Sequence, residues 1–586
     1  MIDASGLIEE KIKEVVKETL EVEIEDVPLE HPRNEDFGDY ASGVSMSLAK
    51  KTVKNPWEVA QELAGELKGA NLTFESSGNH YPIFSSIEAV KPGFINFSLS
   101  DEWLKDQILN VLDSGNGYGS SDVGKGKNII IEYSQPNPNK SMHIGHARNN
   151  FLGSSLSEIY KFAGYSVVRM NYMNDWGSHI CKSMLMYKKY GKGIEPNKKS
   201  DHFIGDFYVM YEKEHEKNPQ EVEKELAEMF KKLEEGDKET YEIWKKITGW
   251  AYEGWKDTYK DENVVFDVWN YQSNYTKSGK EIVKVALEKG IAEKGPTGAV
   301  IAKLDKYGLP DKVMLRSDGT SIYVTQDTQM AKDDYEKYHF DKRIYVVDSR
   351  QSDYFKQLFK IIELLGFKWV GNLYHLAYGW VSLPEGAMSS RTGSVINADD
   401  VFKKLVDLEE DEVRNSMKEI TNLKETSRKV ALAAFRYGIL KVDPKQDIVF
   451  DFSKVTKFEG NTGPYLMYTY ARAKSILEKA GVVEKEMNFN LKKFESVKLN
   501  AKEKQLLRAI YKFPEIVIQA AASFSPHLIA NYSYDVAQRF NSFYADTPVL
   551  KASDEVREFR KGLVKCVSQV MKNSLKLLGI DVVEKM

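Results

Sequence analysis

The sequence predicts an α/β protein whose central part is a Rossmann-like, doubly wound sheet domain with an inserted helical segment. Three observations predict this fold class. NIIIEY (128–133), helical spacing of apolar residues up to Ala163, and the strand-like VVRMNYM (167–173) together form a β–α–β unit. A Gly-, Ser- and Asp-rich segment (114–127) separates this unit from an α+β region before it. Nearly everything from residue 401 onward has helical spacing, which predicts an all-α C-terminal region.

The predicted domain boundaries follow changes of pattern along the chain. KNPWEVAQELAGEL (Lys54–Leu67) has helical spacing and the segment 91–100 alternates like a strand, which predicts an α+β domain at the N-terminus. Charged residues with helical spacing dominate a segment near 185–300, which is predicted to be an insertion on the surface of the sheet domain. The three predicted domains are residues 1–118, 119–400 and 401–586.

The second half of the sheet domain is predicted to resume the alternation of strands and helices. VMLRSDGTSIYVT (313–325) is predicted to be strand–turn–strand, because Asp318-Gly319 is a hairpin signal. The further predicted elements are strands at 343–347 and 374–381 and a helix from about Ser352 to Leu365.

The composition is that of a globular protein from a reducing compartment. The chain has 586 residues, of which 42% are apolar and 29% charged, so several domains are expected. Cys181 and Cys566 are too few for a disulfide framework or a metal site, which predicts a cytoplasmic location. No apolar run is long enough to cross a membrane, and the N-terminus does not resemble a secretory signal. The net charge of −5 neither indicates nor excludes an RNA partner.

The segment QPNPNKSMHIGHARNN (135–150) lies between a predicted strand and a predicted helix, where phosphate-binding loops occur in α/β sheets. Gly145 lets a ligand approach the backbone closely, and His143 and His146 can donate hydrogen bonds to phosphate oxygens. Lys140 adds a cation. Two histidines three apart could instead share a helix face or ligate a metal, but none of the ten histidines makes an obvious third ligand. The pattern favours a nucleotide site and predicts no tightly bound metal.

This segment resembles the first signature, HIGH, of the class I aminoacyl-tRNA synthetases, and EYSQPNPNKSMHIGHARNN resembles the motif of the arginyl-tRNA synthetases among them. Further segments are similar to that family in the expected order: DFGDYASGVSMSLAKK, GFINFSLS, RSDGTSIYVTQD, VVDSRQSDYFKQLF, NTGPYLMYTYARAKSIL and AQRFNSFYADTPVL. The resemblance implies ATP-dependent attachment of L-arginine to tRNA(Arg) through an arginyl-adenylate, with Mg²⁺ carried by ATP. It also implies a monomer whose N-terminal domain contacts tRNA and whose all-α domain binds the anticodon.

The resemblance implies where ATP binds. The expected contacts are His143, Gly145, His146, Lys140, Met388, Ser389 and Arg391. The last three belong to AMSSRTG (387–393), which matches the second signature of the class. Ala387 and Ser390 stand there in place of the usual lysines, so Lys140 is the expected substitute, with Arg391 as a partial one.

The arginine pocket implied by the resemblance consists of Glu132, Asn137, Tyr323, Asp327 and Gln351. Carboxylates suit a guanidinium because they accept its N–H groups in a fork. We expect Glu132 to hold the α-amino group of the substrate and Asp327 its guanidinium. Without the resemblance, Tyr323 would be interpreted as a hairpin aromatic and Asp327 as a helix N-cap.

Contacts with tRNA are expected from Tyr468, Arg472, Arg539 and Tyr544, because they combine cationic and aromatic surfaces. The alternative is a structural role, since aromatic residues at helical spacing usually pack a core. Three other functions are weighed: a class I lysyl-type synthetase, a small nucleotidyltransferase with a similar HxGH loop, and a non-catalytic tRNA-binding relative. The long helical C-terminal region disfavours the nucleotidyltransferase, and the histidines, Lys140 and the pocket acids favour an enzyme over a binding protein.

Overall fold

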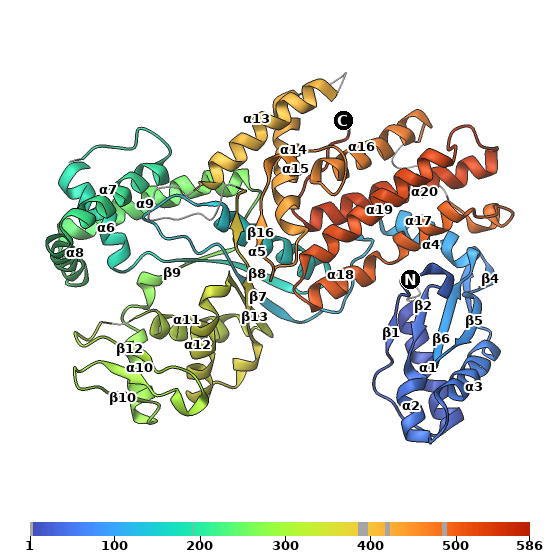
Figure 1. Ribbon diagram of the computed structural model, residues 1–586, viewed down its shortest axis with the longest axis horizontal. Helices are drawn as coiled ribbons and strands as arrows, with labels where there is room; N and C mark the ends of the chain where they lie inside the picture. The colour runs from blue at the N-terminus through green and yellow to red at the C-terminus, as the bar shows by residue number, and fades with distance from the viewer. Residues whose placement is uncertain (1–3, 192, 321, 385–395, 417–421, 483–488) are drawn as a thin grey trace.

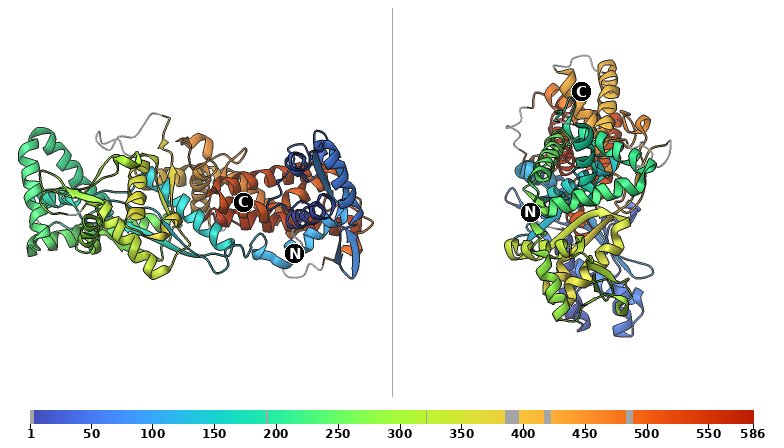
Figure 2. Two further views of the ribbon diagram at one scale, coloured as in Figure 1. Left: turned by 90° about the horizontal axis from the view of Figure 1, so that it is seen from below. Right: turned by 90° about the vertical axis from the view of Figure 1, so that its left-hand side faces the viewer.

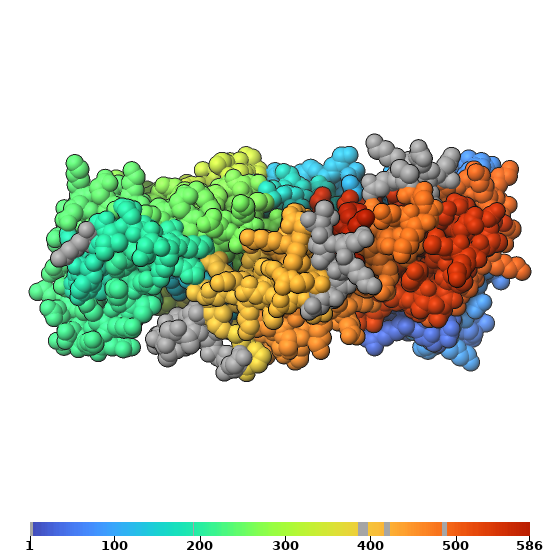
Figure 3. Space-filling view, turned by 90° about the horizontal axis from the view of Figure 1, so that it is seen from above, coloured from blue at the N-terminus to red at the C-terminus, as the bar shows by residue number. Residues whose placement is uncertain are grey.

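The computed structural model describes residues 4–191, 193–320, 322–384, 396–416, 422–482 and 489–586. The protein is elongated: the sheet domain lies between a group of inserted helices at one end and the N-terminal domain with a helical bundle at the other (Figures 1 and 2). Viewed from above, the yellow-orange residues near 400 lie between the green insertion and the red bundle (Figure 3). In the described part of the chain, no helix is long and apolar enough to span a membrane.

The N-terminal domain has the predicted α+β composition. Its antiparallel sheet has the order β1 (Leu29–Glu30), β2 (Tyr40–Ser42), β6 (Phe94–Leu99), β5 (Phe84–Val90), and β3 (Thr73–Ser76) pairs with β4 (Asn79–Pro82). The helices are α1 (Ala4–Leu20), α2 (Val44–Thr52), α3 (Pro56–Gly69) and α4 (Asp101–Ser114). The predicted helix at 54–67 is α3, which begins at Pro56 because the Asn55 side chain caps it by accepting a hydrogen bond from the Trp57 N–H at 2.9 Å.

The central sheet is fully parallel and doubly wound, as predicted. Its order is β14 (Leu373–Tyr378), β13 (Lys342–Asp348), β7 (Asn128–Glu132), β8 (Ser166–Met173), β9 (Val268–Tyr271). From β7 the chain first builds β8 and β9 on one side and later β13 and β14 on the other, so the winding reverses between β7 and β13. Ligands bind at the carboxyl ends of the strands beside such a switch point. The topology alone therefore predicts a ligand site at the carboxyl ends of β7 and β13.

Both faces of this sheet are buried, which explains its continuous apolar strands. On β7, Ile129 and Ile131 pack into the core shared with the C-terminal helices, whereas Ile130 packs into a second core on the opposite face. Helix α5 (Ile144–Phe162) covers the first face, and α10 (Gly279–Glu288), α11 (Tyr323–Tyr338) and α12 (Ser352–Leu364) contribute to the second. The predicted helix at 352–365 is α12, within one residue.

The segment near 185–300 is not wholly helical, because strands interrupt its second part. Helices α6 (Ser178–Met186), α7 (Ser200–Lys217), α8 (Pro219–Glu234) and α9 (Lys238–Asp261) form the projecting group in Figure 1. Strand β9 then returns to the central sheet as its edge, within the range predicted to be an insertion. Strands β10 (Ala292–Lys294), β11 (Val300–Ala302) and β12 (Lys312–Leu315) form a small antiparallel sheet of their own.

The strand–turn–strand prediction at 313–325 is wrong in its second half. The turn exists: Gly319 has φ +79°, and the Asp318 side chain accepts the Thr320 N–H at 2.9 Å. Strand β12 precedes the turn, but helix α11 follows it from Tyr323 onward. An Asp-Gly turn specifies only the local chain reversal. The residues after it form a helix because one face of α11 is buried against the sheet domain.

The C-terminal region is the predicted helical domain. It contains α13 (Ala398–Ser416), α14 (Leu423–Leu440), α15 (Phe452–Val455), α16 (Gly463–Lys479), α17 (Ala501–Tyr511), α18 (Phe513–Ala522), α19 (Pro526–Asp546) and α20 (Asp554–Leu577). It is joined to the sheet domain by β16 (Ile448–Val449), which pairs with β15 (Val381–Ser382). Buried Asp39 of the N-terminal domain lies 2.8 Å from Arg508 Nε, so an ion pair joins the two terminal domains.

Candidate active site

The crevice at the switch point gathers functional side chains from both halves of the sheet. Glu132 is the last residue of β7 and Asp348 is the last residue of β13. Helix α5 begins at Ile144, just beyond the loop that leaves β7. Because parallel strands end at the same edge, these residues converge although more than two hundred positions separate the two strands.

The two histidines of the HIGH segment are held by the backbone of the first turn of α5. The Gly145 N–H donates to His143 Nδ1 and the His143 N–H donates to His146 Nδ1, both at 3.1 Å, so the two residues form a capping box. An Nδ1 atom that accepts a hydrogen bond carries no proton, which leaves the proton of each neutral ring on Nε2. Both imidazoles are therefore fixed as Nε2–H donors.

Electrostatics keeps both rings neutral. Burial, together with the positive charges of Lys140 and Arg350, lowers the pKa of His143 to about 4. Burial and the neighbouring His143 also lower the pKa of His146. At neutral pH the pair adds hydrogen-bond donors to the crevice without adding charge. Gly145 is required here, since a Cβ atom at that position would lie 2.9 Å from His143 Cε1 and Nδ1.

A cavity of about 490 Å³ opens onto these histidines. Its lining includes Lys140, His143, Gly145, His146, Arg350 and Trp380. Burial and the charge of Arg350 lower the pKa of Lys140, which is the response of a buried cation held beside other cations. Arg350 stacks on Trp380 at 3.7 Å from the ring centroid. Sequence analysis missed Arg350 and Trp380, although Arg350 lies two residues after β13, at a sheet edge where ligand-binding residues are expected.

Met388, Ser389 and Arg391 lie outside the described residues, as do Ala387 and Ser390. The chain re-enters the described part at Ile396, directly against the HIGH segment. The Ile144 N–H donates to the Ile396 carbonyl at 3.2 Å, the Ala398 N–H donates to the Met142 carbonyl at 2.9 Å, and the Ser141 hydroxyl donates to Asn397 Oδ1 at 2.6 Å. Residues 396–398 thus clamp residues 141–144.

A second cavity, of about 400 Å³, adjoins the first. All five residues predicted for the arginine pocket line it: Glu132, Asn137, Tyr323, Asp327 and Gln351. Gln135, Asn137, Val347 and Gln351 line both cavities, so the two spaces meet at these residues. The alternatives for two of the residues are wrong: Tyr323 is the first residue of α11 rather than a hairpin aromatic, and the N-cap of α11 is Ile322 rather than Asp327.

The second cavity contains buried polar atoms without partners. Asp327 Oδ1 and the hydroxyls of Tyr172 and Tyr345 are buried and make no hydrogen bond within the described chain. Such atoms are rare in folded proteins and call for an explanation, because an unpaired buried polar group is destabilising. The other Asp327 oxygen accepts the hydroxyl hydrogen of Tyr354. Tyr172, Tyr345 and Tyr354 were not predicted; Tyr345 could have been noticed as a polar side chain inside a buried strand.

Glu132 has a partner inside the protein. It accepts a hydrogen bond from Arg343 at 2.5 Å and one from Gln135 at 3.2 Å. Arg343 lies in β13, is fully buried, and also pairs with Asp334. Burial raises the pKa of Glu132, while the charge of Arg343 opposes that rise. The cavity therefore holds one carboxylate with a built-in counterion and one, Asp327, without.

The predicted tRNA contacts separate into two groups. On α16, Tyr468 and Arg472 stack at 4.6 Å, and Arg472 donates to Asn541 of α19 at 2.5 Å. Tyr544, also on α19, is 43% exposed. Arg539 instead pairs with Glu35 of the N-terminal domain at 2.7 Å, so it joins the two terminal domains.

Fold and site together are those of a class I aminoacyl-tRNA synthetase. A family model described as "tRNA synthetases class I (R), catalytic domain" matches residues 107–452, "Arginyl tRNA synthetase N terminal domain" matches 6–99, and "DALR anticodon binding domain" matches 466–586. The chain belongs to the arginyl-tRNA synthetase family.

Individual relatives agree with this family along the whole chain. The arginine–tRNA ligase of Treponema denticola is 38% identical over 96% of this chain and 95% of that protein. The arginine–tRNA ligase of Borrelia hermsii is 37% identical over 100% of this chain and 99% of that protein. Among solved structures, the Thermus thermophilus arginyl-tRNA synthetase is similar with a TM-score of 0.84 and 25% identity, covering 100% of both chains.

Proposed function

We propose that this enzyme attaches L-arginine to its tRNA in two steps, with Mg-ATP as the second substrate. An oxygen of the arginine carboxylate attacks the α-phosphorus of ATP, giving arginyl-adenylate and pyrophosphate. A ribose hydroxyl at the tRNA 3′ end then attacks the adenylate carbonyl, giving arginyl-tRNA and AMP. The observation that carries the proposal is the unpaired, buried Asp327 Oδ1 in the second cavity. This cavity opens onto the first one, which is lined by His143 and His146 and is called the phosphate site below.

The phosphate chemistry follows from the orientation of the donors. We assign the Nε2–H groups of His143 and His146 to the α-phosphate, whose oxygens gain charge as the fifth bond forms. Lys140 is assigned to the pyrophosphate side, because it is a half-buried cation in the same cavity. Preorganised donors of this kind act by position and charge, without covalent participation.

The lining of the two cavities supports a different role for Glu132 from the one expected from the sequence. The arginine carboxylate must face the α-phosphate, so its α-amino group lies near the junction, where Asn137 and Gln351 line both cavities. Glu132 and Asp327 line only the second cavity, which is called the inner cavity below. We therefore propose that both carboxylates face the guanidinium and that Asn137 and Gln351 serve the α-amino end.

The pocket chemistry favours arginine over lysine. A guanidinium presents five N–H donors in a plane, enough for Asp327 Oδ1, Glu132 and a tyrosine hydroxyl together. A lysine ammonium has three donors at one point and would leave buried acceptors unpaired. Unpaired buried acceptors discriminate between substrates more strongly than a small difference in apolar fit does.

The tRNA, the oligomeric state and the location belong to the same proposal. Tyr468, Arg472 and Tyr544 remain candidates for anticodon contacts, and Arg539 is the weakest candidate because Glu35 already pairs with it. We propose a monomer, as the resemblance implies. Cys181 and Cys566 are buried free thiols, which fits a reducing cytoplasm.

The direct test is arginine-dependent ATP–pyrophosphate exchange, measured with and without tRNA and with lysine as a competing amino acid. Exchange with arginine, including exchange that requires tRNA, supports the proposal. Exchange with lysine alone would keep the class and overturn the pocket assignment. Folded protein that binds tRNA but exchanges neither amino acid would favour a non-catalytic relative.

Arginine binding is expected to strengthen as the pH rises through 7. Burial raises the pKa of Asp327 to about 7, the hydrogen bond from Tyr354 opposes this rise, and the charge of Glu132 adds to it. The guanidinium favours the ionised form, so its binding releases a proton, and affinity should improve about tenfold between pH 6 and pH 8. A raised carboxyl pKa also means that this group destabilises the free protein as the pH rises through 7.

Thermal shift induced by arginine, measured from pH 6 to pH 8, tests this linkage. The shift should grow with pH, and Tyr354→Phe should move the midpoint upward because it removes the hydrogen bond to the carboxylate. An affinity independent of pH in the unmodified enzyme would show that Asp327 does not carry the guanidinium.

A further inference from the structure

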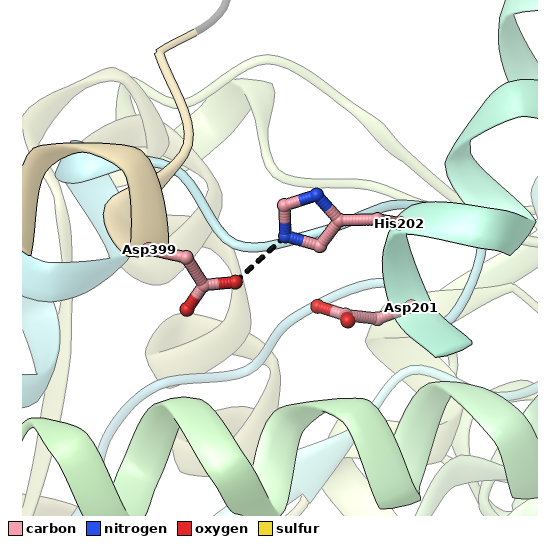
Figure 4. Close-up of side chains that lie close together, drawn as sticks. All are labelled: Asp201, His202 and Asp399. Atoms are coloured by element: carbon pink, nitrogen blue, oxygen red, sulfur yellow. Dashed lines mark hydrogen bonds and ion pairs between the residues drawn. The ribbon is translucent and has the colours of Figure 1, made fainter. Parts of the chain in front are cut away.

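An ion-pair cluster joins the inserted helices to the first turn of α13 (Figure 4). His202 of α7 and Lys199, which precedes α7, contact Asp399 Oδ2 at 2.7 and 2.6 Å. Thr258 of α9 donates to Asp399 Oδ1 at 2.9 Å. Burial opposes ionisation of Asp399, but the hydrogen bond from His202 and the charge of Lys199 outweigh it and lower the pKa of Asp399 to about 2.

The cluster is not suited to a metal ion, although Asp201, His202 and Asp399 form the group of possible ligands in the described part of the chain. Lys199 Nζ lies 2.6 Å from Asp399 and 3.4 Å from Asp201, so its ammonium already occupies the place between the two carboxylates. A divalent cation would have to displace this charge. The cluster is instead a set of ion pairs that joins the start of α7 to the start of α13.

Asp399 is one residue from the clamp on the HIGH segment. The Ala398 N–H donates to the Met142 carbonyl at 2.9 Å, and Asn397 accepts a hydrogen bond from the Ser141 hydroxyl at 2.6 Å. Asn397 and His143 also form an isolated antiparallel β-bridge through their backbones. Within residues 396–399, Asp399 therefore contacts the inserted helices, and residues 396–398 contact residues 141–144. Asp399 itself lines neither cavity.

We propose that Lys199, His202 and Asp399 form a fastening between the inserted helices and residues 396–398, and that through it Asp399 acts as a positioning residue for His143. The inserted helices thereby help to fix the Nε2–H donor of the phosphate site. This inference rests on the proposed role of His143. It gives the helical insertion a part in amino-acid activation that does not depend on contact with a substrate.

Helices α7 and α9 pack against each other beside the cluster. Asp201, fully buried at the start of α7, lies against the backbone of Gly254 in α9, where a Cβ atom would come within 2.4 Å of Asp201 Oδ1. The two helices are thus in close contact beside the cluster. Asp399, in the first turn of α13, also favours the positive end of that helix. Asp399 is therefore held by contacts with α7 and α9 as well as by its own helix, α13.

The test compares Lys199→Met with Lys198→Met in the full-length enzyme. Lys198 is a matched control, because it pairs with Asp206 at 2.7 Å while both side chains are about half exposed. We expect Lys199→Met to lower kcat for arginine-dependent ATP–pyrophosphate exchange about tenfold or more and to leave the KM for arginine unchanged, since a small misplacement of a catalytic group is enough for such a loss. Lys199→Arg, which keeps the charge, should restore most of the rate.

A double-mutant cycle shows whether the effect passes through His143. Asp399→Asn should slow exchange in the unmodified enzyme but have little further effect in the His143→Asn background, because coupled residues are not additive. Faster hydrogen exchange of the amides at 141–146 in Lys199→Met, and not in Lys198→Met, provides a second measurement without catalysis. Equal effects of the two lysine changes, or additivity in the cycle, would overturn the inference. Full exchange activity in His143→Asn alone would instead overturn the proposed role of His143.

Discussion

Replacing His143 with asparagine is expected to lower the rate of arginine-dependent ATP–pyrophosphate exchange about 10²- to 10³-fold, the loss typical of removing one preorganised transition-state donor. Asparagine is a good N-cap, so its side-chain oxygen can still accept the Gly145 N–H and keep the start of α5 intact. It is too short to present a donor where His143 Nε2–H lies. The variant therefore separates the two functions of one side chain.

His143→Gln is the matched comparison. Its longer side chain can place an N–H near the former Nε2 position, whereas glutamine caps a helix less well than asparagine. Exchange should be retained better in His143→Gln, and resistance to urea better in His143→Asn. Arginine-induced thermal shift should persist in both, because the ring does not line the inner cavity. If His143→Asn exchanges normally while remaining folded, the assignment of Nε2–H to the α-phosphate is wrong.

Much of the site could be predicted because the fold itself brings it together. Glu132 ends one strand and Gln351 follows another, and parallel strands on either side of a switch point deliver such residues to one edge whatever the loops do. His143 and His146 are close in sequence and share one helical turn, so their convergence is local. The resemblance placed all five pocket residues, and among them Tyr323 lay in a segment that was expected to be a strand.

Other contacts leave little trace in a single sequence. Lys199 and Asp399 are far apart in the chain, and both look like ordinary surface charges until the folded helices bring them together. Arg343 is different: an arginine in the apolar run of a strand buried on both faces must find buried partners. That signal was present in KRIYVV and could have led to Glu132 and Asp334.

Removing the Arg343 guanidinium is expected to have the largest effect on stability. Arg343 is fully buried and pairs with both Glu132 and Asp334. Arg343→Met leaves two buried carboxyl groups without a counterion, and breaking a buried pair in this way typically costs about 3–5 kcal/mol. Arg343→Lys should recover only part of the loss, since one ammonium cannot reproduce the fork that reaches two carboxylates.

Arg169→Met, on strand β8 of the same sheet, is the matched control. Arg169 pairs with Asp267 at 2.7 Å, but the Asp267 side chain is 40% exposed, so water can replace the lost partner. Exposed pairs are worth about 0–1 kcal/mol, which sets the expected difference between the two variants in urea unfolding at pH 8. Equal destabilisation would show that the Arg343 cluster is no more than an ordinary strand contact.

The pH dependence of the Arg343→Met defect distinguishes lost charge compensation from lost packing. Without Arg343, the pKa of Glu132 should rise further, because burial already raises it against the opposing charge of Arg343. A raised carboxyl pKa destabilises the folded protein as the pH rises through it, so the defect should be largest at pH 8 and shrink towards pH 5. A packing defect would not change with pH. The same variant should also bind arginine more weakly, because a protonated Glu132 accepts hydrogen bonds from a guanidinium poorly. This loss of affinity would come from the missing counterion of Glu132, and not from a lost contact between Arg343 and the substrate.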